Sequence, residues 1–149
     1  DRPLVYEPPP AGPAAGASPR ACRVRGVRMR RGGVFGEHAR WQGVIGPVGG
    51  PLVLLVWRVD HARARPGASF QPRFRDVWCN NFWITTSGDL SDPALLCCVM
   101  EMGIDHILFA VDWPFVMNPP ATEWMKDIPL SDEDKVKILS GNAKRLLRM

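Results

Sequence analysis

The feature that most constrains the fold is a strand, a helix and a second strand that follow one another in the second half of the chain. Residues 82–86 (FWITT) are aromatic and β-branched and stop at a Ser-Gly pair, as a buried strand does. Asp92 and Pro93 supply an N-cap and a first-turn proline for a helix that ends at Gly103. Residues 107–111 (ILFAV) are then an uninterrupted apolar run of strand length. This order predicts a βαβ unit, in which the two strands lie parallel.

Shorter patterns on both sides extend the alternation of strands and helices. Residues 41–45 are a further strand candidate, and Pro51 opens a helix that ends before Pro66. After the βαβ unit we expect a short helix near residues 122–126 and a longer one from Ser131, whose side chain can cap it. The predicted fold class is therefore α/β.

The beginning of the chain has a different character. Residues 4–6 are a short strand candidate, but the prolines that follow exclude a helix because proline has no amide donor. Residues 14–34 hold small residues and six arginines, with too few large apolar side chains to specify a buried face. We therefore divide the chain into an irregular Pro/Gly/Arg-rich segment with one short strand, residues 1–33, and a folded unit, residues 34–149.

Composition excludes several classes of protein. Apolar residues make up 46% of the 149 residues and charged residues 23%, a balance typical of a globular protein. No apolar run approaches the roughly 20 residues that cross a bilayer, and the first residues do not form a signal peptide. We therefore expect a cytoplasmic protein without a membrane partner. A complete eight-stranded α/β barrel takes about 250 residues, so this length permits half a barrel.

The charge is distributed unevenly along the chain. Residues 1–75 carry 13 arginines and 4 acidic side chains, whereas residues 76–149 carry 6 basic and 11 acidic side chains. An arginine-rich arm can bind nucleic acid by neutralising phosphates. However, no aromatic side chain lies between the arginines of residues 20–31, and no nucleic-acid-reading fold is visible. The pattern therefore disfavours nucleic acid as a partner.

The four cysteines show no metal-binding or disulfide pattern. Cys22, Cys79, Cys97 and Cys98 contain no C-x-x-C pair and have no regular spacing. The adjacent Cys97 and Cys98 lie in an apolar stretch, where cysteine behaves as a small hydrophobic residue. We therefore expect buried or free thiols.

Asp112 is the residue that most strongly indicates a function. It follows the apolar run 107–111 directly, and active sites in α/β proteins collect at the carboxyl ends of parallel strands. From this position alone, a structural role such as capping the next loop explains the acid as well as a functional role does.

Three separated motifs provide further evidence for a function, in addition to the position of Asp112. They are NFWITTSG at residues 81–88, MGIDHILFAVDWPF at residues 102–115 and GNAKRLL at residues 141–147. In order and spacing they resemble the last two barrel units of the amidohydrolase-related decarboxylases, which include γ-resorcylate, 2,3-dihydroxybenzoate and aminocarboxymuconate-semialdehyde decarboxylases. A weaker similarity matches residues 33–61 to the sixth strand and helix of the family, and residues 4–8 to its fifth strand. The resemblance implies a partial TIM barrel, its C-terminal half, with about four parallel strands and flanking helices.

The resemblance also implies roles for individual residues. Asp112 would bind a divalent metal, zinc or manganese, and Phe115 would line the substrate pocket. Arg58 would reach the site of a neighbouring subunit and meet the substrate carboxylate, although a solvated helix charge explains this residue equally well. Glu7 stands where the family has a metal-binding histidine and would be an oxygen ligand. Pro47 stands where the family has its catalytic histidine, so no catalytic residue is expected in this chain.

The function implied by the resemblance is nonoxidative decarboxylation of a small aromatic carboxylic acid. Such an enzyme needs a metal to hold the substrate and an acid to protonate the ring carbon as carbon dioxide leaves. Because the acid is missing at Pro47, we expect this chain alone to be inactive. The alternative is a noncatalytic remnant or a half-barrel interaction protein. An open half barrel exposes sheet edges and apolar surface, so we expect a homo-oligomer.

Overall fold

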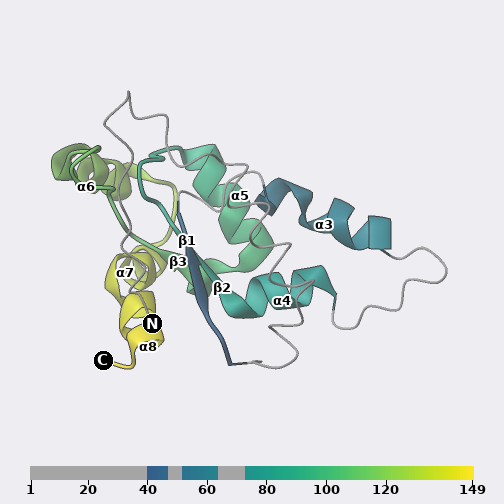
Figure 1. Ribbon diagram of the computed structural model, residues 1–149. Coiled ribbons are helices and arrows are strands. Elements are labelled where there is room, and N and C mark those ends of the chain that lie inside the picture. The colour runs from purple at the N-terminus through teal and green to yellow at the C-terminus, as the bar shows by residue number, and fades with distance from the viewer. Residues whose placement is uncertain (1–39, 47–51, 64–72) are drawn as a thin grey trace, which may run out of the picture.

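The computed structural model describes residues 40–46, 52–63 and 73–149 (Figure 1). Within these residues three strands form one parallel sheet in the order β1-β2-β3. The strands are β1 (Gly43–Ile45), β2 (Phe82–Thr85) and β3 (Ile107–Leu108). The strand expected at residues 4–6 and the predicted boundary at residue 33 lie outside the described residues.

Helices precede and follow each of the last two strands. They are α3 (Leu52–Arg63), α4 (Phe74–Asn81), α5 (Asp92–Met102), α6 (Asn118–Asp127), α7 (Asp132–Val136) and α8 (Asn142–Leu147). A 3-10 turn, η1 (Ile104–His106), precedes β3, and a π-helical turn, η2 (Lys137–Gly141), joins α7 to α8. Among the described helices, none combines the length and the apolar character that a membrane span requires.

The pairing of the strands confirms the predicted βαβ unit. β2 pairs with β3 in parallel, and α5 connects them. The predicted second strand, residues 107–111, was too long, since β3 ends at Leu108. The next amide, that of Phe109, donates to the carbonyl oxygen of Ile138 at 3.0 Å. The backbone therefore leaves the sheet here, although its side chains remain apolar.

Two helices begin elsewhere than the sequence predicts. α5 has Ser91 rather than Asp92 at its N-cap, and the Asp92 carboxylate accepts a 2.6 Å hydrogen bond from Trp124 Nε1. α6 begins at Asn118, well before the expected start near Thr122, because the two prolines after Asn118 suit a first helical turn. The bond to Asp92 ties α6 to the start of α5.

Two helix boundaries in the described residues agree with the prediction. α3 ends at Arg63, ahead of Pro66. The Ser131 hydroxyl caps α7, because it accepts a 3.2 Å hydrogen bond from the amide of Asp134. From there η2 and α8 continue to Leu147, so the long helix expected from Ser131 is present with a π-helical turn inside it.

One helix, α4, was not predicted, although its buried residues recur at helical spacing. Its own N-cap residue makes no side-chain hydrogen bond to the helix. The amides of Phe74 and Arg75 donate instead to the two carboxylate oxygens of Asp60, at 2.7 and 3.1 Å. Because Asp60 belongs to α3, one helix caps the next, and a pattern of neighbouring residues does not reveal the cap.

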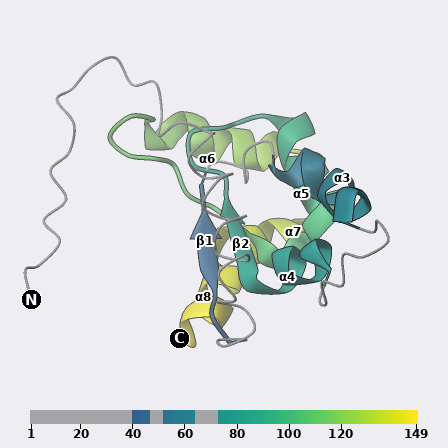
Figure 2. The same cartoon turned by 45° about the vertical axis from the view of Figure 1, so that its right-hand side comes forward.

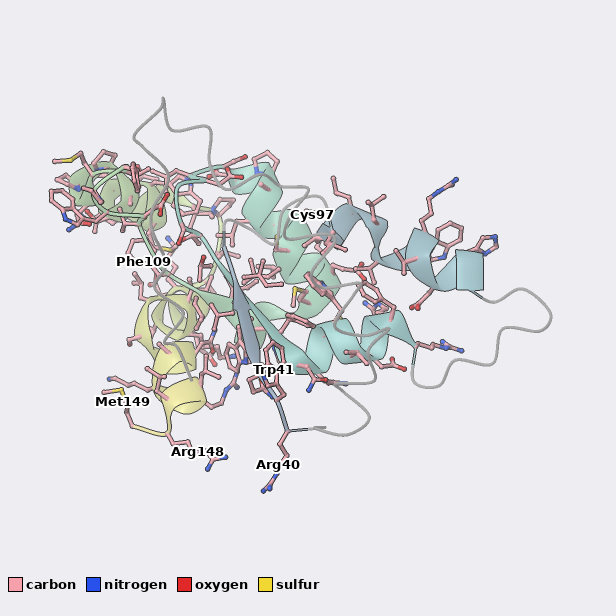
Figure 3. All side chains as sticks on the ribbon, viewed as in Figure 1. Arg40, Trp41, Cys97, Phe109, Arg148 and Met149 are labelled. Carbon is pink, nitrogen blue, oxygen red and sulfur yellow. The ribbon has the colours of Figure 1, made fainter. Side chains whose placement is uncertain are left out.

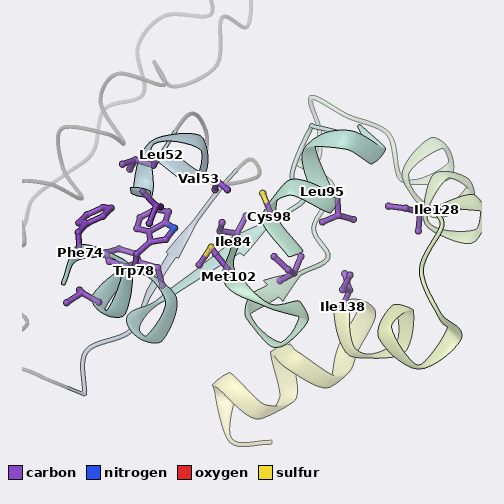
Figure 4. Packing of buried hydrophobic residues seen from close by; sticks show 14 of the residues in the cluster. Leu52, Val53, Phe74, Trp78, Ile84, Leu95, Cys98, Met102, Ile128 and Ile138 are labelled. Carbon is purple, nitrogen blue, oxygen red and sulfur yellow. The ribbon is translucent and has the colours of Figure 1, made fainter. Parts of the chain in front are cut away.

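The hydrophobic core lies on the face of the sheet that the helices cover (Figure 4). Because side chains alternate along a strand, Phe82 and Ile84 of β2 enter this core while Trp83 points to the opposite face. There Trp83 Nε1 donates to Gln42 Oε1 at 2.6 Å, and Val44 remains 55% exposed. The sheet therefore has a packed face and a second face that is partly open.

The two ends of the sheet carry different elements. Arg40, just before β1, lies at the same end of the molecule as Arg148 and Met149, which follow α8 (Figure 3). Figure 2 shows α8 near this amino end of the strands and α6 beyond the opposite end, toward which the strands run. The carboxyl ends of the strands therefore lie on the α6 side of the molecule.

Candidate functional site at the carboxyl ends of the strands

Asp112 lies at the carboxyl ends of two neighbouring strands. It follows β3 in the chain, and its side chain reaches the turn after β2. A Cβ atom placed on Gly88 would lie 3.4 Å from Asp112 Oδ2 and 3.7 Å from Asp112 Cβ. Asp112 is exposed to solvent. An accessible carboxylate at this edge of a parallel sheet stands where α/β proteins collect their active sites.

The backbone on both sides of Asp112 is held by hydrogen bonds. Upstream, the Thr86 hydroxyl donates to Ala110 O at 2.8 Å and accepts from Ala110 N at 3.0 Å. Downstream, Asp112 O accepts hydrogen bonds from the amides of Phe115 and Val116, at 2.9 and 3.2 Å. Asp112 itself has a φ of +74°, in the left-handed region that few residues with a side chain adopt. The surrounding bonds stabilise this conformation.

Phe115 shares a turn with Asp112 and presents its ring to solvent. It is 73% exposed, and Trp113 in the same turn is 65% exposed. The peptide bond between Trp113 and Pro114 is cis. Exposed rings beside a carboxylate place a flat apolar surface next to a negative charge. The turn therefore suits contact with a ligand that has both an aromatic ring and polar groups.

Arg58 lies elsewhere on the molecule. It is exposed on α3, which Figure 1 shows on the side away from α6. Its neighbours Leu54 and Trp57 are 73% and 70% exposed, and the Trp57 ring stacks on His61 with 4.8 Å between centroids. Within one copy of the chain, Arg58 is therefore not brought together with Asp112.

The described residues do not form a metal site by themselves. In the part of the chain that the structure describes, no group of three or more His, Cys, Asp or Glu side chains could hold a metal ion. Zinc takes about four ligands, so the single carboxylate of Asp112 is insufficient. His106 precedes β3 and holds its Nδ1 atom 2.9 Å from Phe82 O, at the amino end of the strands. Glu7 and Pro47 lie outside the described residues.

Two residues that shape this site were not singled out from the sequence. Gly88, with a φ of +71°, turns the chain after β2, and the fully buried Thr86 bonds across to Ala110. The signals were present as a Ser-Gly pair at a strand end and a Thr-Thr pair whose side chains point to opposite faces. The sequence does not show which group each hydroxyl reaches.

Comparison with known proteins shows similarity over most of the chain. A family model, Amidohydrolase, matches residues 15–149. The γ-resorcylate decarboxylase of Rhizobium sp. (strain MTP-10005) is 36% identical over 130 residues, which make up 85% of this chain and 40% of that protein. The γ-resorcylate decarboxylase of Rhodococcus jostii (strain RHA1) is 32% identical with the same coverage. The chain thus spans about two fifths of the length of these relatives.

Solved structures agree on the fold. The 2,6-dihydroxybenzoate decarboxylase from Rhizobium has a TM-score of 0.83 at 35% identity, over 92% of this chain and 43% of that one. A dihydroxybenzoic acid decarboxylase from Polaromonas sp. JS666, solved with bound manganese and the inhibitor 2-nitroresorcinol, has a TM-score of 0.83 at 31% identity, over 92% and 42%. The described strands and helices match part of the barrel of these proteins, so the predicted partial TIM barrel is confirmed.

Proposed function

Because this chain belongs to the amidohydrolase family, we propose that it forms part of the active site of a nonoxidative aromatic-acid decarboxylase. The observation that carries this proposal is the Asp112 carboxylate, which lies beside Gly88 at the carboxyl ends of β2 and β3. The chain spans about two fifths of the γ-resorcylate decarboxylases that it matches. The activity is therefore proposed for the assembled protein and not for the described residues alone.

The proposed substrate is a small aromatic carboxylic acid. One solved relative, 34% identical, is a 2,6-dihydroxybenzoate decarboxylase in complex with 2,6-dihydroxybenzoate. In this chain the backbone amide of Phe115 donates to Asp112 O at 2.9 Å, and the ring of Phe115 is exposed. An exposed phenyl ring in this turn supports stacking against a substrate ring. Phe115 is therefore the proposed substrate-binding residue of this loop.

Arg58 is proposed to bind the substrate carboxylate in a second copy of the chain. The planar guanidinium forms paired hydrogen bonds with a carboxylate, a geometry that a lysine does not provide. The exposed Leu54 and Trp57 on the same helix support this, because their apolar surface favours contact with another subunit. A homo-oligomer is therefore part of the proposal.

Asp112 and Glu7 are proposed as oxygen ligands of a divalent metal, zinc or manganese. The Polaromonas relative was solved with manganese, which supports a divalent cation in the family. In the described part of this chain no two further His, Cys, Asp or Glu side chains join Asp112 in a group that could hold a metal ion, and Glu7 lies outside that part. The remaining ligands must come from other residues, so we derive no reaction step through the metal.

The reaction also requires a proton donor. Decarboxylation breaks the bond between the carboxylate carbon and the ring carbon, and the ring carbon takes a proton as carbon dioxide leaves. Pro47 stands at the position of the family's catalytic histidine, and proline has no proton to give. We therefore propose that the chain as it stands does not turn over substrate. The same residue favours the alternative, a noncatalytic remnant or interaction protein.

A chimera tests this proposal. Residues 40–149 would replace the matching part of the Rhizobium sp. γ-resorcylate decarboxylase, and carbon dioxide release from 2,6-dihydroxybenzoate would be measured with Mn²⁺ present. We expect the chimera to be inactive and Pro47→His to restore turnover, since a general acid contributes about 10²- to 10⁴-fold. Adding Asp112→Asn to Pro47→His should remove the restored activity.

Matched variants separate the role of each residue. Pro47→Ala removes the proline without adding a donor and should stay inactive. Asp105→Asn changes another carboxylate, which pairs with Arg145 at 3.4 Å before β3, and should leave the restored activity in place. Activity that survives Asp112→Asn contradicts the role of this aspartate, and a folded but inactive Pro47→His chimera favours the noncatalytic alternative.

A further inference from the structure

We propose that Thr86 is a positioning residue that fixes the direction of the Asp112 carboxylate. This inference rests on the proposed function of Asp112 and adds a residue that acts through it. Thr86 does not need to touch a substrate in this role. It acts on the backbone that leads from β3 into the site.

The hydroxyl of Thr86 replaces the strand pairing that ends at Leu108. The last main-chain bond between the two segments runs from Thr86 N to Leu108 O, at 3.0 Å. Beyond it, the Thr86 hydroxyl donates to Ala110 O at 2.8 Å and accepts from Ala110 N at 3.0 Å. Both groups of Ala110 are therefore satisfied by one side chain, which is 0% exposed.

The position of this bond in the chain links it to Asp112. Ala110 lies two residues before Asp112, so the hydroxyl fixes the backbone immediately ahead of the carboxylate. After Asp112, the amide of Phe115 donates to Asp112 O at 2.9 Å and closes the turn. Because both sides are fixed, few backbone rotations remain that could redirect the side chain.

Gly88 lies beside the carboxylate of Asp112. A Cβ atom at this position would lie 3.4 Å from Asp112 Oδ2 and 3.7 Å from Asp112 Cβ, which is van der Waals contact. The φ of +71° at Gly88 also disfavours any other residue. Thr86 and Gly88 lie in one turn after β2, so a single segment both fixes the backbone and lies beside the side chain of Asp112.

Thr85, the residue before Thr86 and the last of β2, provides a matched control. Its hydroxyl donates to Ser87 Oγ at 2.9 Å and makes no hydrogen bond to Ala110. Replacing either threonine with valine removes one hydroxyl and keeps the β-branched shape. A merely structural contribution would lower the stability of both variants without changing the side-chain angle of Asp112 in the folded protein.

The experiment uses nuclear magnetic resonance on the full chain without added metal or substrate. Couplings from Asp112 Cγ to its backbone nitrogen and carbonyl carbon report whether the side chain holds one rotamer. We expect one rotamer in the natural sequence, in Thr86→Ser and in Thr85→Val, and averaged couplings in Thr86→Val. The amide of Ala110 should exchange with solvent about ten-fold faster in Thr86→Val, as the loss of one hydrogen bond implies.

Unchanged Asp112 couplings in a folded Thr86→Val variant overturn the inference. Asp112 couplings that are averaged to the same extent in Thr85→Val also overturn it. If Thr86→Val does not fold, the natural sequence supplies the test, because the Thr86 hydroxyl proton must be protected from exchange and coupled to Ala110. A rapidly exchanging hydroxyl proton overturns the inference. The chimera with Asp112→Asn tests the proposed function separately, so the two failures are distinguishable.

Discussion

Single buried side chains hold together segments that are far apart in the chain. Asn142 is 2% exposed and donates to the carbonyl oxygens of Ile104 and Ile107, at 2.9 and 2.7 Å. One turn later, the guanidinium of Arg145 lies over the Trp83 ring, 5.3 Å from its centroid. The amino end of β3 is therefore tied to α8 by polar contacts, because buried carbonyl groups without partners would be destabilising.

Cys98 allows a prediction about thiol reactivity. Burial, and to a smaller extent the neighbouring Cys97 and Asp89, raise the pKa of its thiol to about 12. At pH 8, iodoacetamide should therefore modify the partly exposed Cys97 and leave Cys98 unmodified until the protein unfolds. Fragment-ion mass spectrometry of the labelled peptide distinguishes the two positions, and equal labelling would contradict the prediction.

The raised pKa of Cys98 also determines how the stability of the folded protein changes with pH. The unfolded chain loses the Cys98 proton near the ordinary thiol pKa of 9.0, whereas the folded chain keeps it to about 12. The contribution of the neutral thiol to stability is therefore present below pH 9 and decreases as the pH rises toward 12. Unfolding curves of Cys98→Ala should lack this part of the alkaline decrease.

Among the elements, α3 and α4 depend on one shared carboxylate. Asp60 accepts hydrogen bonds from two amides at the start of α4, so Asp60→Ala leaves both without this acceptor. We expect the free energy of unfolding to fall by about 1–2 kcal/mol, the usual cost of losing a helix cap. Urea denaturation measures the change. Asp76→Ala, at an exposed acid in the first turn of α4, should cost about 0.5 kcal/mol or less, and equal losses in both variants would contradict the shared cap.

The elements that could be predicted are those whose signals are local. The βαβ unit follows from residues 82–86, a capped helix and an apolar run, and the Ser131 cap lies within a few residues of its amide. The sequence did not predict α4 because its cap comes from Asp60, a residue of another helix. The predicted β3 was too long because the hydroxyl of Thr86, and not the backbone of β2, forms hydrogen bonds with Ala110, after Leu108. Both errors come from contacts between elements, which a pattern along the chain does not contain.

The candidate site likewise has features that the sequence predicts and features that it does not. Asp112 could be placed near the carboxyl ends of the strands because the apolar run before it and the turn after it are local features, although β3 itself ends at Leu108. The place of Asp112 beside Gly88 and the bond from Thr86 to Ala110 depend on how β2 and β3 align, which the register determines. The separation of Arg58 from Asp112 depends on the arrangement of α3, and the sequence alone does not give it.

For the whole molecule, the partly open face of the sheet predicts self-association. Val44 lies on this face in the edge strand of the described sheet and is 55% exposed. An exposed apolar edge pairs readily with another chain, and a charge on it opposes such pairing. Sedimentation at increasing concentration should therefore show oligomers, and Val44→Lys should reduce them.

A second lysine substitution tests whether this effect is local. Leu147 is 65% exposed on α8, at the amino end of the strands and away from the carboxyl ends. Leu147→Lys adds the same charge and should leave the oligomers unchanged. A natural chain that stays monomeric at every concentration, or an equal effect of both substitutions, would argue against association through the sheet.

The division between the packed face and the strand ends has an evolutionary consequence. Folding depends on Phe82, Ile84 and the helices that cover them, whereas the candidate site lies in loops beyond the last paired residues. A lineage can therefore accumulate substitutions in those loops and abandon its original chemistry while selection on folding remains satisfied. The fold is then retained and can evolve a different function.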